Sequence, residues 1–328
     1  MTARAATAAP ESVRTPRRIL VIWNPAAGLP TTVLGGTVDD LRETLERHGI
    51  QADIAEPADE DDARAVVRRA VTERVDVVVA AGGDGTVHLV ADGLVGTEIA
   101  LGILPFGRVM NIARSLGIGR DIDAAAETLV NGEIRSIDTG EAVAADGRVV
   151  AFFEAGSVGM NAAIFREVTR ADEGDAASIP RTIWVALRYR PARMTVEVED
   201  DAIRTRALMV AAAIGPYLGL GMTVAPGALL DDGRFDVQIL ARFSKSELLR
   251  HLAAIAFGRR RYAPQVSTHR SSTVRISSAR PLPARADGID LGTTPVTFRT
   301  RPASLRVVVP AGQLTTDSPS SDSDRRRM

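Results

Sequence analysis

A glycine-rich segment with the sequence Gly-Gly-Asp-Gly-Thr spans residues 82–86, directly after the apolar run 75–81. We interpret the run as a buried strand that ends in a turn, with a helix beginning at that turn. Glycines allow the backbone to approach an anion closely, and the N–H groups at the start of a helix attract negative charge. Because Asp84 would repel phosphate, we expect a divalent cation to mediate part of the contact. The segment predicts a phosphate site, and the alternative is a tight turn without a ligand.

The basic residues exclude two large classes of phosphotransferase. Lys245 is the only lysine among the 40 lysines and arginines, and no glycine-rich turn lies near it. A Walker A loop and a protein-kinase fold both need a lysine at the nucleotide phosphates. A phosphate site in this chain would therefore belong to neither class.

The composition is typical of a soluble globular protein large enough for two domains, with 328 residues, 45% hydrophobic and 25% charged. No apolar run approaches the roughly 20 residues needed to cross a bilayer, and residues 1–16 lack the apolar region of a signal peptide. We therefore expect a cytoplasmic protein. The absence of cysteine excludes disulfides and thiolate zinc sites, and the four histidines lack metal-ligand spacing. A net charge of -1 does not suggest nucleic-acid binding.

Short apolar runs alternate with helical patterns in the first part of the chain, which predicts a doubly wound, parallel α/β sheet. In such a sheet, ligands bind beyond the carboxyl ends of the strands. The turns that follow the first, third and fourth runs would therefore meet at one edge. The expected strands are 19–23, 51–55, 75–81 and 99–104, and the expected helices are 37–48, 61–73 and, with Asp121 as its N-cap, 122–129.

The second part of the chain changes to short alternating strands separated by turn signals, which predicts a mostly antiparallel β-sandwich. We place an α/β ATP-binding domain at 17–134, completed by about 303–310, and the sandwich at 135–302. The polar tails 1–16 and 311–328 should be disordered. The expected strands are 193–199, 207–214, 234–240, 273–276, 295–299 and 304–309, with helices at 183–189 and 245–257.

Five motifs, in this order, resemble the diacylglycerol kinase catalytic-domain family, and more narrowly the bacterial soluble lipid kinases related to sphingosine kinases. The resemblance extends from about Arg18 to Pro310. It implies a nucleotide-binding α/β domain followed by a β-sandwich, with ATP and a lipid meeting in the cleft between them. The motifs are Asn-Pro-x-x-Gly at 24–28, Gly-Gly-Asp-Gly-Thr at 82–86, Leu-Pro-Phe-Gly at 104–107, Ala-Arg at 113–114 and Ala-Pro-Gly-Ala-x-x-Asp-Asp-Gly at 225–233.

The resemblance assigns ATP binding to three turns of the first domain. Where the family usually has Gly-Thr-x-Asn-Asp, this chain has Gly-Arg-Val-Met-Asn over 107–111. A neutral amide at Asn111 cannot supply the charge that an acidic residue would give to a metal or proton network. Arg108 could contact phosphate directly instead, and a solvated surface arginine is the alternative. The expected ATP-binding residues are Asn24, Pro25, Gly28, Gly82, Gly83, Asp84, Gly85, Thr86, Gly107, Arg108 and Asn111.

An acidic turn in the second domain resembles a structural Mg²⁺ site of the family. The resemblance implies that Asp232 and the backbone of Leu229 and Arg234 hold the cation. Carboxylate and carbonyl oxygens are the ligands that Mg²⁺ prefers, and an acidic β-turn without metal is the alternative.

The family's catalytic glutamate is replaced in this chain. Ile289 stands where the family has the glutamate that is the proposed base for the lipid hydroxyl. We hypothesise that Asp290 takes this role and that Asp287 orients the acceptor. His88 stands where the family commonly has asparagine, and for it we favour packing on the helix surface. Phosphoryl transfer depends mainly on positioning and electrostatics, so the loss of one base is survivable.

The leading hypothesis is an ATP- and Mg²⁺-dependent kinase that phosphorylates the hydroxyl of diacylglycerol or a related lipid. Two alternatives stay open: a catalytically weak or dead nucleotide- or lipid-binding pseudo-kinase, because of Asn111 and Ile289, and an NAD kinase, which shares the Gly-Gly-Asp-Gly-Thr segment. A lipid substrate implies peripheral contact with an anionic membrane surface, and a homodimer stays open. The candidates for membrane contact, which a solvated helix end would also explain, are Arg259, Arg260 and Arg261.

Overall fold

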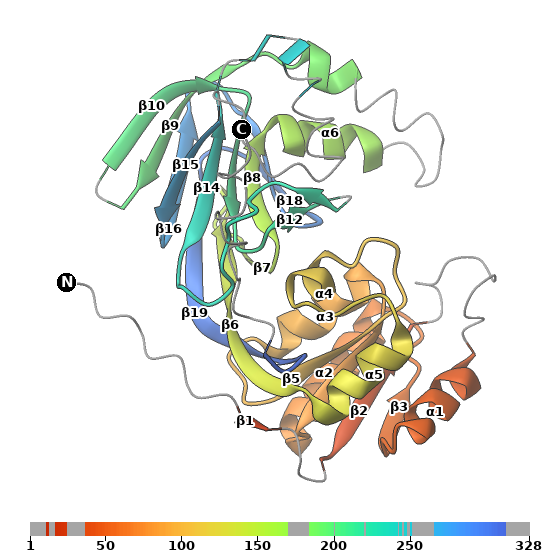
Figure 1. Cartoon of the computed structure of the whole chain (residues 1–328). Helices are drawn as coiled ribbons and strands as arrows, with labels where there is room; N and C mark the ends of the chain where they lie inside the picture. The colour runs from red at the N-terminus through yellow and green to blue at the C-terminus, as the bar shows by residue number, and fades with distance from the viewer. Residues whose placement is uncertain are drawn as a thin grey trace, which may run out of the picture.

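The protein has two lobes, which Figure 1 shows one above the other in the computed structural model. The lower lobe contains the N-terminal strands and helices, drawn in red to yellow, and the upper lobe contains most of the later strands. The last strand, drawn in blue, returns from the upper lobe to the lower one. The structure describes residues 11–12, 17–24, 37–169, 184–199, 201–219, 221–241, 243–244, 246–247, 250 and 266–312.

A parallel four-stranded sheet forms the centre of the first lobe, in the order β5-β4-β2-β3. Its central strands β4 and β5 are buried along their whole length, as apolar runs covered on both faces should be. The strands lie where the sequence predicts them. They are β2 (Ile19–Trp23), β3 (Ala52–Ala55), β4 (Val77–Gly82) and β5 (Ala100–Pro105).

Helices connect the strands of this sheet and begin at polar caps. Thr37 forms a capping box at the first helix, and Asp59 and Asp121 cap two others through their side chains. The helix after β4 begins directly at the glycine turn, and its N-cap Gly83 provides no side-chain cap. The helices are α1 (Val38–Arg47), α2 (Glu60–Glu73), α3 (Asp84–Leu94), α4 (Asn111–Ser115) and α5 (Ile122–Asn131).

Two long strands, β6 (Glu133–Val143) and β19 (Val296–Val309), join the lobes into one sheet. β19 runs parallel to β5 near Val307, while its other end pairs antiparallel with a strand of the second lobe. The two strands predicted at 295–299 and 304–309 are therefore one, and a register shift after Arg301 accommodates the irregular segment between them. The predicted domain boundaries fall within these shared strands and stay a prediction.

The second lobe is mostly antiparallel. Its six-stranded sheet has the order β15-β14-β11-β8-β17-β18 and lies against the extension of the large sheet that β9, β10 and β16 form. Phe152 of the large sheet stacks on Phe235 of the six-stranded sheet, with ring centroids 5.7 Å apart. The elements are β7 (Val149–Phe152), β8 (Ala155–Gly159), α6 (Met160–Thr169), β9 (Ala192–Val198), β10 (Asp201–Ala207), β11 (Met209–Ala213), β12 (Tyr217–Leu218), β13 (Met222–Thr223), β14 (Phe235–Leu240), β15 (Val266–Ser271), β16 (Thr273–Ser278), β17 (Pro283–Ala286) and β18 (Ile289–Thr293).

Several elements differ from the prediction. β8 was not predicted, because its glycines and small residues have low strand propensity. A Cβ atom on Gly156 would lie 2.2 Å from the ring of Phe298, so this buried strand needs its small residues for packing. Glu11–Ser12 pairs with β6, where we expected disorder. Residues 184–188 are helical as predicted, and most of the helix predicted at 245–257 lies outside the described residues.

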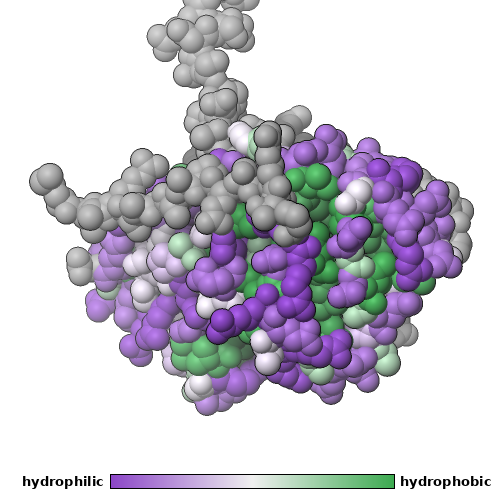
Figure 2. Space-filling model, turned by 90° about the horizontal axis from the view of Figure 1, so that it is seen from below, coloured by the Kyte–Doolittle hydropathy of each residue, from purple (hydrophilic) through white to green (hydrophobic). Residues whose placement is uncertain are grey.

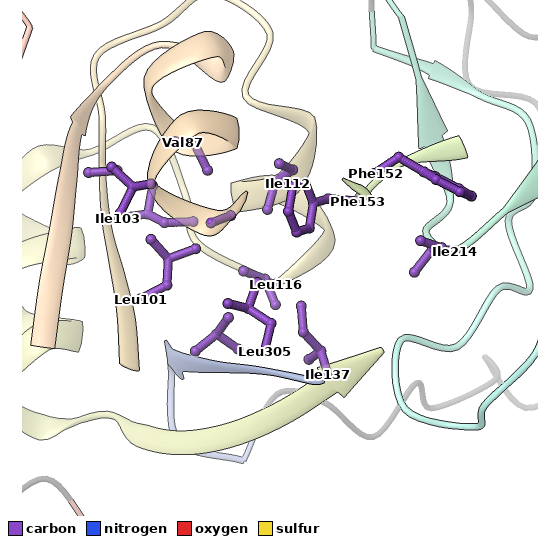
Figure 3. Close-up of a cluster of buried hydrophobic side chains, with 14 of the residues drawn as sticks. Val87, Leu101, Ile103, Ile112, Leu116, Ile137, Phe152, Phe153, Ile214 and Leu305 are labelled. Carbon is purple, nitrogen blue, oxygen red and sulfur yellow. The ribbon is translucent and has the colours of Figure 1, made fainter. Parts of the chain in front are cut away.

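The hydrophobic core is continuous between the lobes. Figure 3 shows Ile112 of α4 and Leu116, which directly follows this helix, in the same cluster as Phe152, Phe153 and Ile214 of the second lobe. A shared core and a shared sheet resist movement of one lobe against the other.

The surface carries few large exposed apolar side chains, which are Val149 and Trp184 among the described residues. On the face in Figure 2, hydrophobic side chains reach the surface in a central area surrounded by hydrophilic ones. Apolar atoms contribute more than half of the accessible surface of folded proteins, so this area needs no functional assignment. In the described part of the chain, no helix has the length and apolar character that spanning a membrane would require.

Candidate functional site

Two glycine turns, at the carboxyl ends of β4 and β5, pack backbone against backbone. A Cβ atom on Gly107 would lie 2.8 Å from Cα of Gly83, and a Cβ atom on Gly82 would lie 2.5 Å from the hydroxyl oxygen of Thr86. Both contacts are closer than real side chains allow, so glycine is required at positions 82 and 107. A Cβ atom on Gly85, by contrast, would meet nothing within 4 Å, because this residue borders open space.

The carboxylate of Asp84 holds the two turns together. Its two oxygens accept hydrogen bonds from the backbone N–H groups of Met110 and Asn111, both at 2.9 Å. These groups belong to the start of α4, which has no side-chain cap of its own, so Asp84 caps this helix from another element. A carboxylate has about four lone-pair sites, which leaves Asp84 with acceptor positions for a cation.

Asn24 lies beside the glycine turn, at the end of β2. Its backbone N–H donates to the carbonyl of Ala81 at 3.0 Å, and its side-chain amide donates to the hydroxyl of Thr86 at 3.1 Å. The structure therefore brings Asn24 next to the glycine segment. Pro25 and Gly28, which complete its motif, lie outside the described residues.

A pocket of about 700 Å³ opens beside these turns. Its lining comes from Asn24, residues 57–60, the first turn of α3 and residues 107–109, so it includes Arg108. The first N–H groups of a helix have no partner inside the helix, and its dipole is positive there, so this border of the pocket attracts anions. Asn111, which we expected to bind ATP, is only 1% exposed and does not line this pocket.

A second pocket, of about 540 Å³, adjoins the first. The first lobe contributes His88 and Ile112 to it, and the second lobe contributes Glu154 and residues 149–151 and 287–289. The first turn of α3 is therefore the wall between the two pockets. The residues that line both pockets are Glu60, Asp84, Gly85 and Leu89.

Asp287 fastens the turn between β17 and β18 to the start of β8. Its Oδ1 accepts hydrogen bonds from the backbone N–H groups of Glu154 and Ala155, at 3.1 and 2.9 Å. Its Oδ2 accepts one from the N–H of Phe153 at 2.6 Å and lies 3.5 Å from Nε2 of His88. With three backbone donors on one carboxylate, Asp287 is held in a single orientation, and its φ of 43° is left-handed.

His88 faces the second lobe, whereas we favoured packing on the helix surface. Its ring lies edge-on to Phe153, with the ring centroids 4.9 Å apart. Together with the short distance to Asp287, this contact places His88 at the junction of the two lobes, in the wall of the second pocket.

Glu154 is a carboxylate of the second pocket that our sequence reasoning missed. Its Oε2 accepts a 2.8 Å hydrogen bond from Nδ2 of Asn111, which also donates to the carbonyl of Gly219 at 2.7 Å. Burial and the nearby charge of Asp287 raise the pKa of Glu154 well above its ordinary value, while the hydrogen bond from Asn111 opposes this shift. The only signal in the sequence was one acidic residue directly after an apolar run.

Arg285 supplies positive charge behind this pocket. It is 8% exposed, its Nε donates to the carbonyl of Asp287 at 2.6 Å, and its guanidinium lies 3.6 Å from the ring centroid of Phe165. Burial lowers the pKa of Arg285 to about 10, against the opposing effect of Asp287, Asp290 and Glu154. It therefore stays charged at neutral pH and partly balances the carboxylates.

Asp290, our predicted base, lines neither pocket. Arg166 holds its carboxylate with two hydrogen bonds, from Nε to Oδ2 at 2.7 Å and from Nη2 to Oδ1 at 2.6 Å. The hydrogen bonds from Arg166 hold the pKa of Asp290 below its ordinary value. Its neighbour Ile289 lines the second pocket instead, in keeping with the alternation of side chains along a strand. Because Asp290 is weakly basic and lies elsewhere, the geometry does not support it as a proton acceptor.

The predicted magnesium turn has an arginine at its carboxylate. Oδ1 of Asp232 accepts the backbone N–H of Arg234 at 3.0 Å, and its other oxygen pairs with Arg270. Among the residues that the structure describes, no group of three or more histidines, aspartates or glutamates could hold a metal. A Mg²⁺ held by Asp232 with the backbone of Leu229 and Arg234 would compete with Arg270 for this carboxylate, so the magnesium site stays a prediction.

The residues predicted to contact the membrane cannot be placed. Arg259, Arg260 and Arg261 lie outside the described part of the chain. Their role stays a prediction.

Comparison with known families divides the chain at the same junction of the lobes. Residues 18–142 match the diacylglycerol kinase catalytic domain, and residues 154–309 match the YegS C-terminal NAD kinase beta sandwich-like domain. The two matches occur in this order and together include both glycine turns and the Glu154 pocket. The chain belongs to the diacylglycerol kinase catalytic-domain family. The resemblance inferred from the motifs is confirmed.

The chain is a divergent member of this family. It is 24% identical over 300 residues to a diacylglycerol kinase of Bacillus subtilis, which covers 90% of this chain and 97% of the relative. A diacylglycerol kinase of Staphylococcus aureus is 25% identical over 305 residues, covering 90% and 93%. A crystal structure of a diacylglycerol kinase from Bacillus anthracis superposes with a TM-score of 0.68 at 17% identity, over 89% of this chain and 97% of that one. This likeness confirms the fold: an α/β domain followed by an antiparallel β-sandwich.

Proposed function

We propose that this protein is an ATP- and Mg²⁺-dependent lipid kinase that phosphorylates the hydroxyl of diacylglycerol or a related lipid in the cleft between its lobes. The observation that carries the proposal is that two pockets meet at Asp84 and Gly85. A phosphate donor in the first pocket and a hydroxyl acceptor in the second would approach each other across the start of α3. Positioning of this kind supplies much of the catalysis in phosphoryl transfer.

The first pocket suits the nucleotide. The N–H groups of the first turn of α3 and the guanidinium of Arg108 would bind the phosphates. Asn24 and Thr86 would keep the turn in shape, and the remaining lone pairs of Asp84 would hold Mg²⁺. When bound, Mg²⁺ neutralises the charge that develops on the transferred phosphoryl group.

The second pocket suits an amphipathic alcohol. Its polar wall consists of Glu154, Asp287 and His88, whereas Ile112 and Ile289 add apolar surface. Val149, which also lines this pocket, is 58% exposed and offers an apolar edge that acyl chains can cover. The names of the relatives, diacylglycerol kinases, support a lipid as the acceptor.

A diacyl lipid stays in the bilayer, so the proposal includes a cytoplasmic protein in peripheral contact with an anionic membrane surface. Arg259, Arg260 and Arg261 are the candidates from the sequence, each worth about 1 kcal/mol near an anionic surface. Trp184, 60% exposed, is a side chain of the type that anchors at a membrane interface. We propose no nucleic-acid partner, and a homodimer stays open.

The two predicted catalytic residues, Asp287 and Asp290, have different hydrogen-bond partners and therefore different roles in this proposal. Asp287, predicted to orient the acceptor, would do so by fixing the shape of the acceptor pocket, because three backbone N–H groups hold its carboxylate. Asp290 as the base stays a prediction that the pairing with Arg166 weakens.

Two other functions need testing against the lipid kinase. A pseudo-kinase that binds nucleotide without transfer is favoured by Ile289, because an apolar residue replaces the family's glutamate. An NAD kinase is favoured by the description of the matched C-terminal domain.

One assay separates the three functions. The purified full chain is incubated with ATP labelled at the γ-phosphate and Mg²⁺, together with either diacylglycerol in mixed micelles or NAD. We expect labelled lipid phosphate and no labelled NADP. Transfer to NAD alone would identify an NAD kinase, and nucleotide binding with transfer to neither would identify a pseudo-kinase.

A further inference from the structure

Among the carboxylates that line the acceptor pocket, Glu154 has neither a salt bridge nor two or more backbone hydrogen bonds, whereas Glu60 and Asp92 pair with Arg64. Asp287 accepts three backbone hydrogen bonds, and Asp84 accepts two. Asp290 lies outside the pocket in its pair with Arg166. Glu154 accepts a hydrogen bond from the neutral amide of Asn111 and one from the backbone of Gly219.

We propose that Glu154 is the general base of the kinase, and that its carboxylate takes the proton of the acceptor hydroxyl. The proposal rests on the proposed function, since it names the proton acceptor in that same site. The base predicted from the sequence was Asp290, in the segment 287–290, whereas Glu154 directly precedes β8.

The position of Glu154 in the second pocket supports its role as the general base. Glu154 lines the second pocket together with Asp84, and Asp84 also lines the first pocket. A hydroxyl in the second pocket would therefore lie between the phosphate donor and Glu154. The hydrogen bond from Asn111 fixes one oxygen of Glu154, as a base must be held in one orientation to act.

The charges around Glu154 make it a stronger base than a solvated carboxylate. Asp84 on α3 and Asp287 on the β17–β18 turn both disfavour a further negative charge here, and burial has the same effect. Asn111 on α4 opposes them with a hydrogen bond but brings no charge. Arg285 on β17 is a nearby cation that moderates this repulsion, and His88 on α3 lies 3.5 Å from the carboxylate of Asp287. A carboxyl poised closer to neutral pH accepts a proton more readily in the transition state.

The contacts of Asp287 and His88 explain why neither residue is proposed as the general base. Asp287 would lose its bonds to the backbone N–H groups if it moved toward a substrate. His88 is held between the ring of Phe153 and the carboxylate of Asp287, which fixes its ring at the junction of the lobes.

The reaction balances with ATP as the phosphate donor. The acceptor oxygen forms a bond to the γ-phosphorus, and the bond between this phosphorus and the bridging oxygen breaks. ADP leaves with the electron pair of that bond. The proton of the acceptor hydroxyl passes to the carboxylate of Glu154 and from there to solvent.

The test compares Glu154→Gln with the unmodified protein and with Asp236→Asn. Asp236 is a buried carboxylate on β14 whose pKa burial also raises, and it lines neither pocket, so it controls for the loss of a buried acid. Transfer from ATP to diacylglycerol is measured between pH 5 and 9, and nucleotide affinity is measured separately by equilibrium binding. We expect Glu154→Gln to lower kcat by about 10²–10⁴-fold with unchanged ATP affinity.

The pH profile distinguishes a base from a residue that only supports the pocket. In the unmodified protein and in Asp236→Asn, kcat should rise from acidic pH and then level off. This acidic limb should be absent from the residual activity of Glu154→Gln. If Glu154→Gln keeps the limb or keeps full turnover, or if Asp290→Asn shows the loss instead, the assignment is wrong. An unmodified protein that transfers phosphate to no lipid overturns the proposed function and this role with it, whereas active unmodified protein with active Glu154→Gln overturns the role alone.

Discussion

The side-chain amide of Asn111 donates a 2.8 Å hydrogen bond to Oε2 of Glu154, across the junction of the two lobes. Asn111 follows the second glycine turn and is buried, and Glu154 precedes the buried strand β8. The pair links the turn that Asp84 caps to the wall of the acceptor pocket. A neutral donor at position 111 lets a carboxylate occupy position 154 without direct repulsion.

Replacement of Asn111 by aspartate, the residue that the family usually has here, should lower activity at low pH rather than raise it. Asn111→Asp removes the donor and adds a like charge next to Glu154, so the pKa of the coupled pair should rise further. We expect the acidic limb of kcat to move to higher pH by a similar amount. Measurement of turnover with diacylglycerol between pH 5 and 9 checks this, and an unchanged profile would contradict it.

The two glycines of the phosphate turn should respond differently to alanine. Gly82→Ala forces a methyl group against Thr86, so it should lower the melting temperature of the protein. Gly85→Ala meets no protein atom but places a methyl group at the wall of both pockets. It should keep the melting temperature and weaken ATP binding by at least about tenfold, roughly 1.4 kcal/mol. Thermal unfolding and equilibrium ATP binding of both variants check this prediction. If the two variants have the same melting temperature and the same ATP affinity, the assignment of the nucleotide site is contradicted.

Asp84→Asn should weaken both the turn and nucleotide binding. An amide nitrogen would face one of the two N–H groups that the carboxylate now accepts, which costs about 1–3 kcal/mol for an unsatisfied donor. The loss of charge should also remove the partner of the nucleotide-bound cation. Asp121→Asn is a matched control, because Asp121 caps α5 outside both pockets and asparagine caps a helix about as well as aspartate. It should retain ATP affinity; if Asp84→Asn retains it too, Asp84 does not belong to the site.

Glu154→Gln should stabilise the fold at neutral and alkaline pH. The pKa of Glu154 is raised in the folded protein, so the unmodified chain loses stability as the pH rises from the ordinary pKa of a glutamate through the raised value. Removal of the carboxylate removes this loss, so Glu154→Gln should be more stable than the unmodified protein at pH 8 and equal to it near pH 4.

The opposite sign is expected for Asp290→Asn. The pKa of Asp290 is lowered by Arg166, so its contribution to stability is present above the ordinary pKa of an aspartate and is lost as the pH falls through the lowered value. This variant should be less stable than the unmodified protein at pH 7 and equal to it at low pH. Chemical unfolding of both variants at several pH values checks the two signs together.

The elements that the sequence predicted well are those whose signal is local. β4 and β5 are continuous apolar runs, and the glycine turn after β4 combines close backbone contacts with the start of a helix within a few residues. β8 lacks a local signal, because small residues make it a poor strand in isolation, and the ring of Phe298 from a distant strand explains them.

The part of the site that could not be predicted depends on contacts between distant residues. Glu154 bonds to Asn111, 43 residues earlier, and its backbone N–H binds Asp287, 133 residues later. Its pKa is a property of these neighbours and of burial, neither of which a single sequence displays. The surroundings of Asp290 could not be predicted for the same reason, because its partner Arg166 lies 124 residues away.

The proposed lipid kinase activity is tested by measuring transfer of the γ-phosphate of ATP to diacylglycerol by the purified chain. Labelled ATP, Mg²⁺ and diacylglycerol micelles are combined with the unmodified protein and with Gly85→Ala, and the labelled lipid is quantified. We predict a labelled lipid phosphate that requires Mg²⁺ and that falls at least about tenfold in Gly85→Ala at subsaturating ATP. Unmodified protein that binds ATP but forms no labelled lipid, or a Gly85→Ala variant that forms as much as the unmodified protein, would contradict it.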